Sequence, residues 1–366
     1  MRREYARCCS VFRRKTRTFA PFLHVYQDYA ASFYRIGEDI LDVSLFYTPL
    51  PKRLEARYKN FLSSADLRDE GDADVVALAT DDDFNVVACG ARAGHTLKQF
   101  AVSPDLEGEG VFATVLSELL NEAARAGQKR LFICTKPKNR AMFQSMGFYP
   151  IVETRDAVLM EDRKNGFTDY LASLPRYEGE CGAIVVNGDP FTRGHLHLCE
   201  YAAKHCDALY VFSVSEPGSM FSPDERYEML KAGTAHLKNC HVEHTDEYLV
   251  SRETFPAYFI RDEEHADAVK ADLDIELFRK RIAPALHIKK RFVGEEPFSP
   301  TTRAYNERMK QLLPESGIEL IEIPRLDAIS ASRVRACIRE GTPEQTKDLV
   351  PETTYAAILR YAERNA

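Results

Sequence analysis

The sequence predicts an α/β protein in which a mixed α/β domain precedes a domain with a doubly wound parallel sheet. Its 366 residues exceed the roughly 100–200 of one ordinary domain, so two or three domains are expected. From Tyr177 onward, short apolar runs alternate with amphipathic stretches, as strands alternate with helices. This alternation favours parallel strands joined by right-handed crossovers, with helices on both faces of the sheet.

The expected elements follow in chain order. In the first block we expect strands at 74–80, 85–89, 96–102 and 130–135, and helices at 111–126 and 139–146. In the second block we expect strands at 183–187, 208–214, 240–245 and 318–323, and helices at 195–205 and 222–233. We divide the chain into a basic N-terminal extension (1–50), a first domain (51–156), a polar linker (157–180) and a second domain (181–366).

Composition excludes several classes of partner. The 49 Lys and Arg residues against 56 Asp and Glu give a formal net charge of −7, which disfavours general binding to nucleic acid or anionic lipid. The apolar run 181–186 is far shorter than the roughly 20 residues that a membrane span needs. Nine cysteines without a C-x-x-C pair argue against a disulfide framework and favour a reducing compartment. We expect a cytoplasmic protein without nucleic-acid or membrane partners.

One segment of the second block predicts a phosphate site. An apolar strand ends at Asn187, a turn follows, and a helix begins near Gly194. This geometry directs free backbone N–H groups and the positive end of the helix dipole at a ligand beyond the sheet edge. Thr192 and His195 would place a hydroxyl and an imidazole beside that ligand, and Gly194 would allow a close approach. The alternative is that His195 is an ordinary histidine on the helix surface.

A second segment follows an expected strand and begins another helix. It reads Ile-Ser-Ala-Ser-Arg-Val-Arg from Ile329, and it places Ser330 and Ser332 in the first helical turn with Arg335 one turn later. Hydroxyls at a helix N-terminus and a guanidinium suit phosphate oxygens. The alternative is that Ser330 is only an N-cap and Arg335 a solvated side chain.

Together the two segments resemble the T/H-x-G-H and I-S-S-T-x-x-R signatures of the HIGH nucleotidyltransferase superfamily. The resemblance implies a Rossmann-like domain that catalyses attack on the α-phosphate of ATP, with Mg²⁺ held by phosphates and water and by no protein side chain. It implies that His195 stabilises charge at the α-phosphate and that Thr192 orients it. It further implies that Ser330, Ser332 and Arg335 hold the departing pyrophosphate. Asn187 and Phe191 belong to the same implied ATP site.

Further segments resemble the C-terminal domain of the citrate lyase ligase family over nearly all of 182–359. They are VGEEPFSPTTRAYN from Val293, FSPDERYEML from Phe221, TFPAYF from Thr254 and IAPAL from Ile282. This resemblance implies an ATP-dependent ligase that joins acetate, through acetyl-AMP, to the thiol of the CoA-like group on the acyl-carrier subunit of citrate lyase. Gly294 and Glu295 follow an expected strand and are expected beside the nucleotide. Arg226 is either a scaffold cation or a phosphate contact.

The first block resembles the GNAT acetyltransferase fold. The loop with Gly108 and Gly110 opens a helix, where GNAT proteins bind the pyrophosphate of CoA through backbone amides. Glu107 and Glu109 would place two negative charges there, so we do not expect transfer from acetyl-CoA. Holding the carrier's CoA-like arm and a purely structural role both remain open.

Two departures from the family pattern bear on the substrate: Asp189 replaces an expected Asn, and Arg193 replaces an apolar residue. One alternative is another adenylyl- or cytidylyltransferase with a phosphopantetheine or mononucleotide acceptor. A second alternative is a CoA-binding GNAT module whose second domain is inactive.

Overall fold

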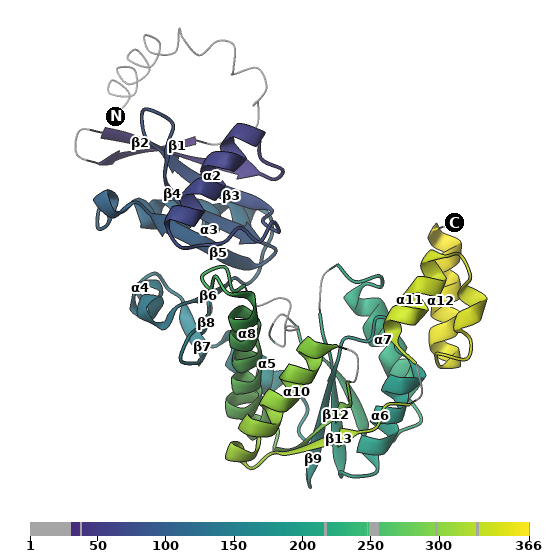
Figure 1. Cartoon of the computed structure of the whole chain (residues 1–366). Coiled ribbons are helices and arrows are strands. Elements are labelled where there is room, and N and C mark those ends of the chain that lie inside the picture. Colours follow the sequence, from purple (N-terminus) through teal and green to yellow (C-terminus); the bar gives the residue numbers. More distant parts are fainter. Residues whose placement is uncertain are drawn as a thin grey trace. The chain divides into compact units, whose positions relative to one another are not determined.

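The predicted mixed α/β class, with a doubly wound parallel sheet in the second half, is confirmed by the computed structural model (Figure 1). The structure describes residues 31–36, 39–215, 218–246, 248, 256–296, 299–326 and 329–365. The chain divides into two units, residues Met1–Lys129 and Arg130–Ala366, and each is described by itself.

The first unit is an antiparallel sheet with two helices. Neighbouring strands pair in chain order, and helix α2 buries Tyr58 and Leu62 against Val76 and Leu78 of the sheet. Helix α3 packs on the same sheet and buries Leu119. The elements are β1 Ala31–Ile36, β2 Asp39–Tyr47, α2 Lys52–Ser64, β3 Val75–Thr80, β4 Val86–Ala93, β5 Thr96–Val102, a 3₁₀ turn at Pro104–Leu106, and α3 Val111–Arg125.

The N-terminal boundary differs from the expected one. Residues 1–30 of the expected extension lie outside the described residues, but β1 and β2 fall inside it and pair antiparallel. Strand β2 belongs to the sheet because Val43 and Leu45 alternate with Ser44 and are buried at 1% and 4% exposure. The alternation of apolar and polar residues there is short and follows a basic segment, so the sequence gives only a weak signal for a strand.

The second unit begins with a small antiparallel set of strands. Strand β8 pairs with both β6 and β7. Strand β8 and helix α5 lie within 157–180, where we expected a linker, because the apolar side chains of both elements are buried. The elements are β6 Phe132–Thr135, a 3₁₀ turn at Pro137–Asn139, α4 Arg140–Ser145, β7 Tyr149–Glu153, β8 Val158–Glu161 and α5 Gly166–Ser173.

A five-stranded parallel sheet follows, in the order β11-β10-β9-β12-β13. The chain starts in the central strand, moves outward on one side and returns to the other, so β9 and β12 flank the switch point where α/β proteins bind ligands. The strands are β9 Cys181–Val186, β10 Ala208–Ser213, β11 Cys240–His244, β12 Ile288–Gly294 and β13 Glu319–Ile323.

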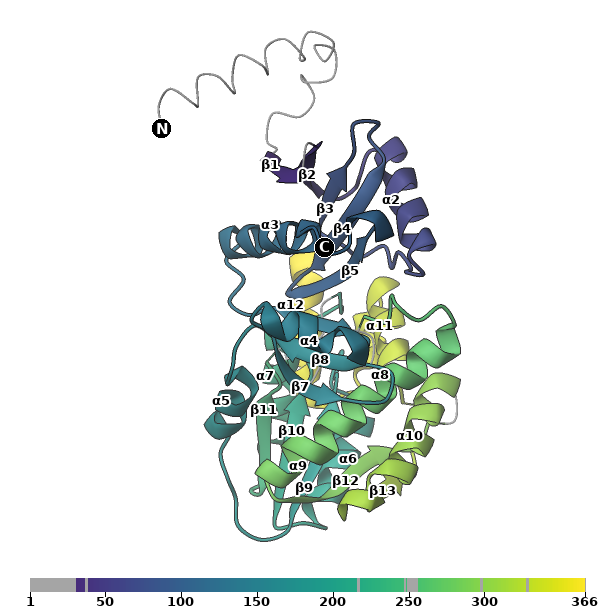
Figure 2. The same cartoon turned by 90° about the vertical axis from the view of Figure 1, so that its left-hand side faces the viewer.

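Helices cover both faces of this sheet. Figure 1 shows α6 and α7 on one side of the strands and α8 and α10 on the other, and Figure 2 shows α8 and α10 in front of the sheet. The helices are α6 Arg193–Ala203, α7 Pro223–Thr234, α8 Glu263–Leu277, α9 Ala283–Ala285, α10 Pro300–Leu312, α11 Ala331–Arg339 and α12 Glu352–Asn365, with a π-helical turn at Phe278–Ile282 and 3₁₀ turns at Pro314–Ser316 and Pro343–Thr346. None of the helices in the described ranges has the length and apolar character of a bilayer-spanning helix.

The hydrophobic core beneath the α6 face holds the strand ends in place. Ile184 of β9 and Val211 of β10 pack with Phe191, which is fully buried in the loop between β9 and α6. Gly233 of α7 lies so close to Phe191 that an added Cβ would be 2.5 Å from Cε1 of the ring. The helix and the loop therefore meet at van der Waals distance only because residue 233 is glycine.

We expect Gly233→Ala to destabilise the second unit. Overpacking of a dense core costs about 1–3 kcal/mol, and the better helix propensity of alanine offsets at most about 1 kcal/mol of it. Urea unfolding followed by far-UV circular dichroism measures the loss. Gly294→Ala is the matched control, because an added Cβ there meets no atom within 4 Å. Equal stability of the two variants would contradict the packing argument.

Candidate active site

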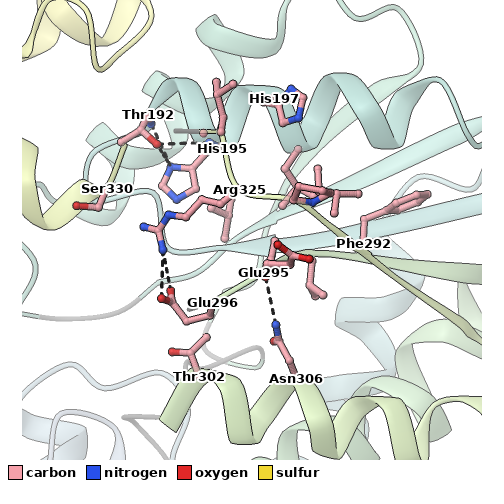
Figure 3. Close-up of a pocket in the computed structure, with 18 of the residues that line it drawn as sticks. Thr192, His195, His197, Phe292, Glu295, Glu296, Thr302, Asn306, Arg325 and Ser330 are labelled. Carbon is pink, nitrogen blue, oxygen red and sulfur yellow. Dashed lines mark hydrogen bonds and ion pairs between the residues drawn. The ribbon is translucent and has the colours of Figure 1, made fainter. Parts of the chain in front are cut away.

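A cavity of about 330 Å³ lies at the carboxyl ends of β9, β12 and β13 (Figure 3). The N-termini of α6 and α11 and one side of α10 complete its wall. Among the predicted site residues, seven line it: Asn187, Thr192, Gly194, His195, Gly294, Glu295 and Ser330. In the described part of the chain, four other residues predicted for the ATP site lie outside the lining, namely Phe191, Arg226, Ser332 and Arg335, as do Gly108 and Gly110 of the GNAT-like loop.

Thr192 and His195 form a reciprocal cap at the start of α6. The Thr192 hydroxyl accepts the His195 backbone N–H at 3.3 Å, and the Thr192 backbone N–H donates to Nδ1 of His195 at 3.0 Å. Figure 3 shows both contacts. Because Nδ1 accepts a hydrogen bond, the proton of the neutral imidazole resides on Nε2. The cap thus makes His195 a hydrogen-bond donor in the cavity wall.

The charge state of His195 follows from its surroundings. Burial lowers its pKa to about 4, and the nearby Arg325 guanidinium acts in the same direction. The ring of Phe191 stacks on the imidazole at 5.8 Å between centroids and is itself fully buried. His195 is therefore a neutral, fixed donor at physiological pH, and Phe191 is its packing support.

Arg226 braces the loop that precedes the cavity. Its side chain is 1% exposed, and its Nη1 donates to the backbone carbonyl of Asn187 at 3.2 Å. This contact favours the scaffold interpretation over the phosphate-contact interpretation. Arg226 belongs to α7, which begins with a capping box formed by the N-cap Ser222 and the Glu225 carboxylate.

Arg335 and Asp189 hold the second motif against the first. The Asp189 carboxylate accepts the backbone N–H groups of Met220 and Phe221 at 3.0 and 2.9 Å. It lies 3.6 Å from Nη1 of Arg335, which also donates to the Asp189 carbonyl. Asp189 therefore joins the loop after β9 to residues 220–221 and to α11. Both carboxylate oxygens accept N–H groups, which accounts for an aspartate where we expected Asn. The predicted contact of Arg335 with phosphate stays a prediction.

The other residues of the two motifs lie at helix starts. Ser330 caps α11 by accepting the backbone N–H of Arg333 at 3.2 Å, and it lines the cavity. A Cβ added to Gly194 would meet only Thr192 Oγ1 at 3.5 Å and the Ile329 carbonyl at 3.9 Å, so glycine leaves that side of the cavity open. Arg193 does not line the cavity, and its Nε donates to the Val350 carbonyl at 3.2 Å.

Sequence reasoning missed an ion pair in the cavity wall. The Arg325 guanidinium contacts both carboxylate oxygens of Glu296, at 3.1 and 3.2 Å (Figure 3). It also donates to the carbonyl of Ile329. The available signal was positional, because both residues lie just beyond the carboxyl ends of strands β12 and β13.

Strand β12 reaches the cavity through Gly294 and Glu295. The Asn306 amide of α10 donates to the Gly294 carbonyl at 3.1 Å and to the Glu322 carboxylate at 3.0 Å, while the Glu295 backbone N–H donates to Ile323 at 2.9 Å. These bonds fix the loop so that Glu295 lines the cavity. The described residues contain no group of three His, Cys, Asp or Glu side chains placed to hold a metal.

The GNAT-like loop lies in the first unit. Gly108 and Gly110 have φ values of +89° and +81°, a region that favours glycine, and Gly110 caps α3. The backbone therefore explains both glycines, whereas the CoA-type ligand stays a prediction.

Comparison with known proteins gives three findings. The family model described as citrate lyase ligase C-terminal domain matches residues 181–358. The citrate (pro-3S)-lyase ligase of Klebsiella pneumoniae is 40% identical over 315 residues, which span 83% of this chain and 92% of that protein. Two solved structures are similar at low overall scores, and each matches one part of the chain.

The first is a GNAT-family acetyltransferase from Staphylococcus aureus Mu50, with 9% identity and a TM-score of 0.29, covering 33% of this chain and 99% of that chain. The second is Thermotoga maritima TmcAL bound with alpha-thio ATP, with 15% identity and a TM-score of 0.34, covering 50% of this chain and 56% of that chain.

The depressed pKa of His195 predicts a pH-dependent stability. An unfolded histidine binds a proton below about pH 6.5, whereas the folded imidazole stays neutral down to about pH 4. The unfolded state therefore binds more protons in this window, and the free energy of unfolding falls as pH falls through it. Between pH 7 and pH 5 the wild type should lose roughly 2 kcal/mol more than His195→Gln, which retains an acceptor for the Thr192 N–H. Urea unfolding at both pH values measures this, and parallel curves would refute it.

Asp189→Asn should destabilise the loop between β9 and α6. An amide offers one oxygen where the carboxylate accepts two N–H groups, so one buried donor loses its partner, at a cost of about 1–3 kcal/mol. Asp224→Asn removes the same charge from an exposed position in α7 and is the control. Thermal unfolding compares the two, and an equal melting temperature would contradict the assigned role.

Proposed function

The chain belongs to the citrate lyase ligase family, and from this premise we propose that it uses ATP to join acetate to the thiol of the CoA-like group on the acyl-carrier subunit of citrate lyase. The observation that carries this proposal is the neutral His195, held as a donor in a cavity between the N-termini of two helices. In this proposal residues 181–366 form the catalytic domain, which the family match over 181–358 supports.

The cavity offers ATP two anion-binding elements. The N-terminal turns of α6 and α11 present backbone N–H groups and positive dipole ends on the cavity wall. We assign the α-phosphate to the Nε2–H of His195 and to the start of α6, with Thr192 fixing the imidazole. The pyrophosphate portion is assigned to the start of α11, with Ser330, Ser332 and Arg335 as the contacts in this proposal.

Arg325 adds a partly exposed cation to this assignment. Its guanidinium is 23% exposed and pairs with Glu296, which is 20% exposed, so neither partner is locked in the core. Nη1 of Arg325 makes both contacts with the Glu296 carboxylate, and a phosphate offers the guanidinium more acceptor oxygens and more charge than a carboxylate. Arg325 would therefore exchange Glu296 for ATP on binding.

The reaction has two steps in this assignment. An oxygen of acetate attacks the α-phosphorus of ATP, forming the P–O bond of acetyl-AMP as pyrophosphate leaves. The carrier thiolate then attacks the acetyl carbonyl, forming the thioester as AMP leaves. The protein aligns the two substrates and stabilises charge on the transferring groups through preorganised donors.

Mg²⁺, when bound, would neutralise phosphate charge. It retains water and binds phosphates readily, so it needs few protein ligands. Among the described lining residues, Glu295 and Glu296 are the carboxylates that would orient its water shell. No step of the proposed reaction is assigned to a protein-bound metal.

Acetate-dependent exchange of pyrophosphate into ATP tests the first step. We expect exchange with acetate in the wild type and a loss of about 10²–10³-fold in His195→Ala, since a preorganised donor to the transition state is removed. His236→Ala removes an exposed imidazole from the same unit and should retain full exchange. Exchange that requires phosphopantetheine or a mononucleotide instead of acetate would contradict the ligase proposal and indicate another nucleotidyltransferase.

A further inference from the structure

Arg291 is a buried cation in the wall of the same cavity. It lies on β12, where its backbone registers with Ala183 of β9 and Leu320 of β13, so it belongs to the interior of the sheet. It is 5% exposed and lines the cavity that also contains His195. Phe292, the next residue, packs in the core of the α6 face, and successive side chains of a strand point to opposite faces. Arg291 therefore lies on the face covered by α8 and α10.

The Arg291 guanidinium has no hydrogen-bond or ion-pair partner among the described residues. Its Nε and Nη1 atoms are both buried without an acceptor. The guanidinium stacks over the ring of Phe278, with Cζ 4.6 Å from the ring centroid. Asp274, the neighbouring carboxylate, accepts the hydroxyl of Tyr305 instead. Burial lowers the pKa of Arg291, while Tyr305 and Asp274 act in the opposite direction.

An arginine in this state is poised for an anion. Removing a guanidinium from water without a partner is costly, and an arginine stays protonated when buried. The planar fork of donors matches a carboxylate or a phosphate. Phosphates already have two helix N-termini on the cavity wall, whereas Arg291 lies three residues before the end of β12 and is distinct from both. The remaining anion of the proposed reaction is the carboxylate of the acid.

We propose that Arg291 binds the carboxylate of a short-chain monocarboxylic acid, with Val293 and Met309 of the cavity wall beside its alkyl group. This inference rests on the proposed ligase function and adds its acid subsite. Val293 and Met309 both line the cavity and offer the apolar surface that a methyl group needs. One carboxylate oxygen would stay with the guanidinium while the other faces the α-phosphorus near His195.

Arg291→Met tests the subsite, because methionine has an unbranched side chain without a charge or a hydrogen-bond donor. We expect the KM for acetate in ATP–pyrophosphate exchange to rise at least about tenfold, with the KM for ATP within about twofold of wild type. Arg308→Met is the matched control: Arg308 of α10 pairs with Asp272 of α8, is 40% exposed and does not line the cavity, so its loss should leave both KM values unchanged. An unchanged KM for acetate in folded Arg291→Met overturns the inference.

Two further measurements keep the test decisive. If Arg291→Met does not fold, Arg291→Lys keeps the charge and loses the fork, and the same selective rise in the KM for acetate is expected. Binding of ¹³C-acetate to the full chain, followed by NMR without ATP, separates this inference from the function. Acetate binding that Arg291→Met abolishes supports the subsite even if the wild type shows no exchange. Wild-type exchange with acetate binding unaltered in the variant upholds the ligase and rejects the subsite.

Discussion

The cap that joins Thr192 and His195 is the interaction on which the rest of the site depends. One backbone N–H, donated to Nδ1 of His195, starts α6, orients the imidazole and places the ring proton on Nε2. The buried ring of Phe191 prevents the imidazole from turning, and Gly233 makes room for Phe191. The same short segment therefore satisfies the backbone N–H groups at the start of α6 and also holds a neutral hydrogen-bond donor in a fixed position.

Two arginines that the sequence places near phosphate also hold the loops of the site together. Arg226 holds the Asn187 carbonyl from within the core, and Arg335 contacts both the carboxylate and the carbonyl of Asp189. These contacts keep the β9 loop and the start of α11 in one arrangement before any ligand arrives. Preorganisation of this kind is what electrostatic stabilisation requires, because donors that are already fixed need no reorganisation during the reaction.

Local patterns predicted the parallel strands of the second unit and helices α6 and α7. The expected helix at 222–233 and strands at 208–214 and 240–245 match α7, β10 and β11 within one or two residues, and the resemblance to the citrate lyase ligase family is confirmed. The missed features depend on contacts between distant segments. Glu296 and Arg325 are 29 positions apart in the sequence. They pair because they follow β12 and β13, and only the strand order shows that these two strands are neighbours. Strand β8 lies in the expected linker because its four residues are too few to show a period of two.

The charges of the cavity explain how a protein with a net charge of −7 would accept a nucleotide. Glu295 and Glu296 bring two negative charges to the wall, and both would repel phosphate at close range. Arg325 pairs with Glu296 and offsets one of these two charges. The neutral His195 adds no charge that would bind ATP tightly in its ground state. In the proposed reaction, Arg325 and two helix termini would bind the phosphates, Arg291 would bind the acid, and the imidazole would stabilise the group that changes charge during the reaction.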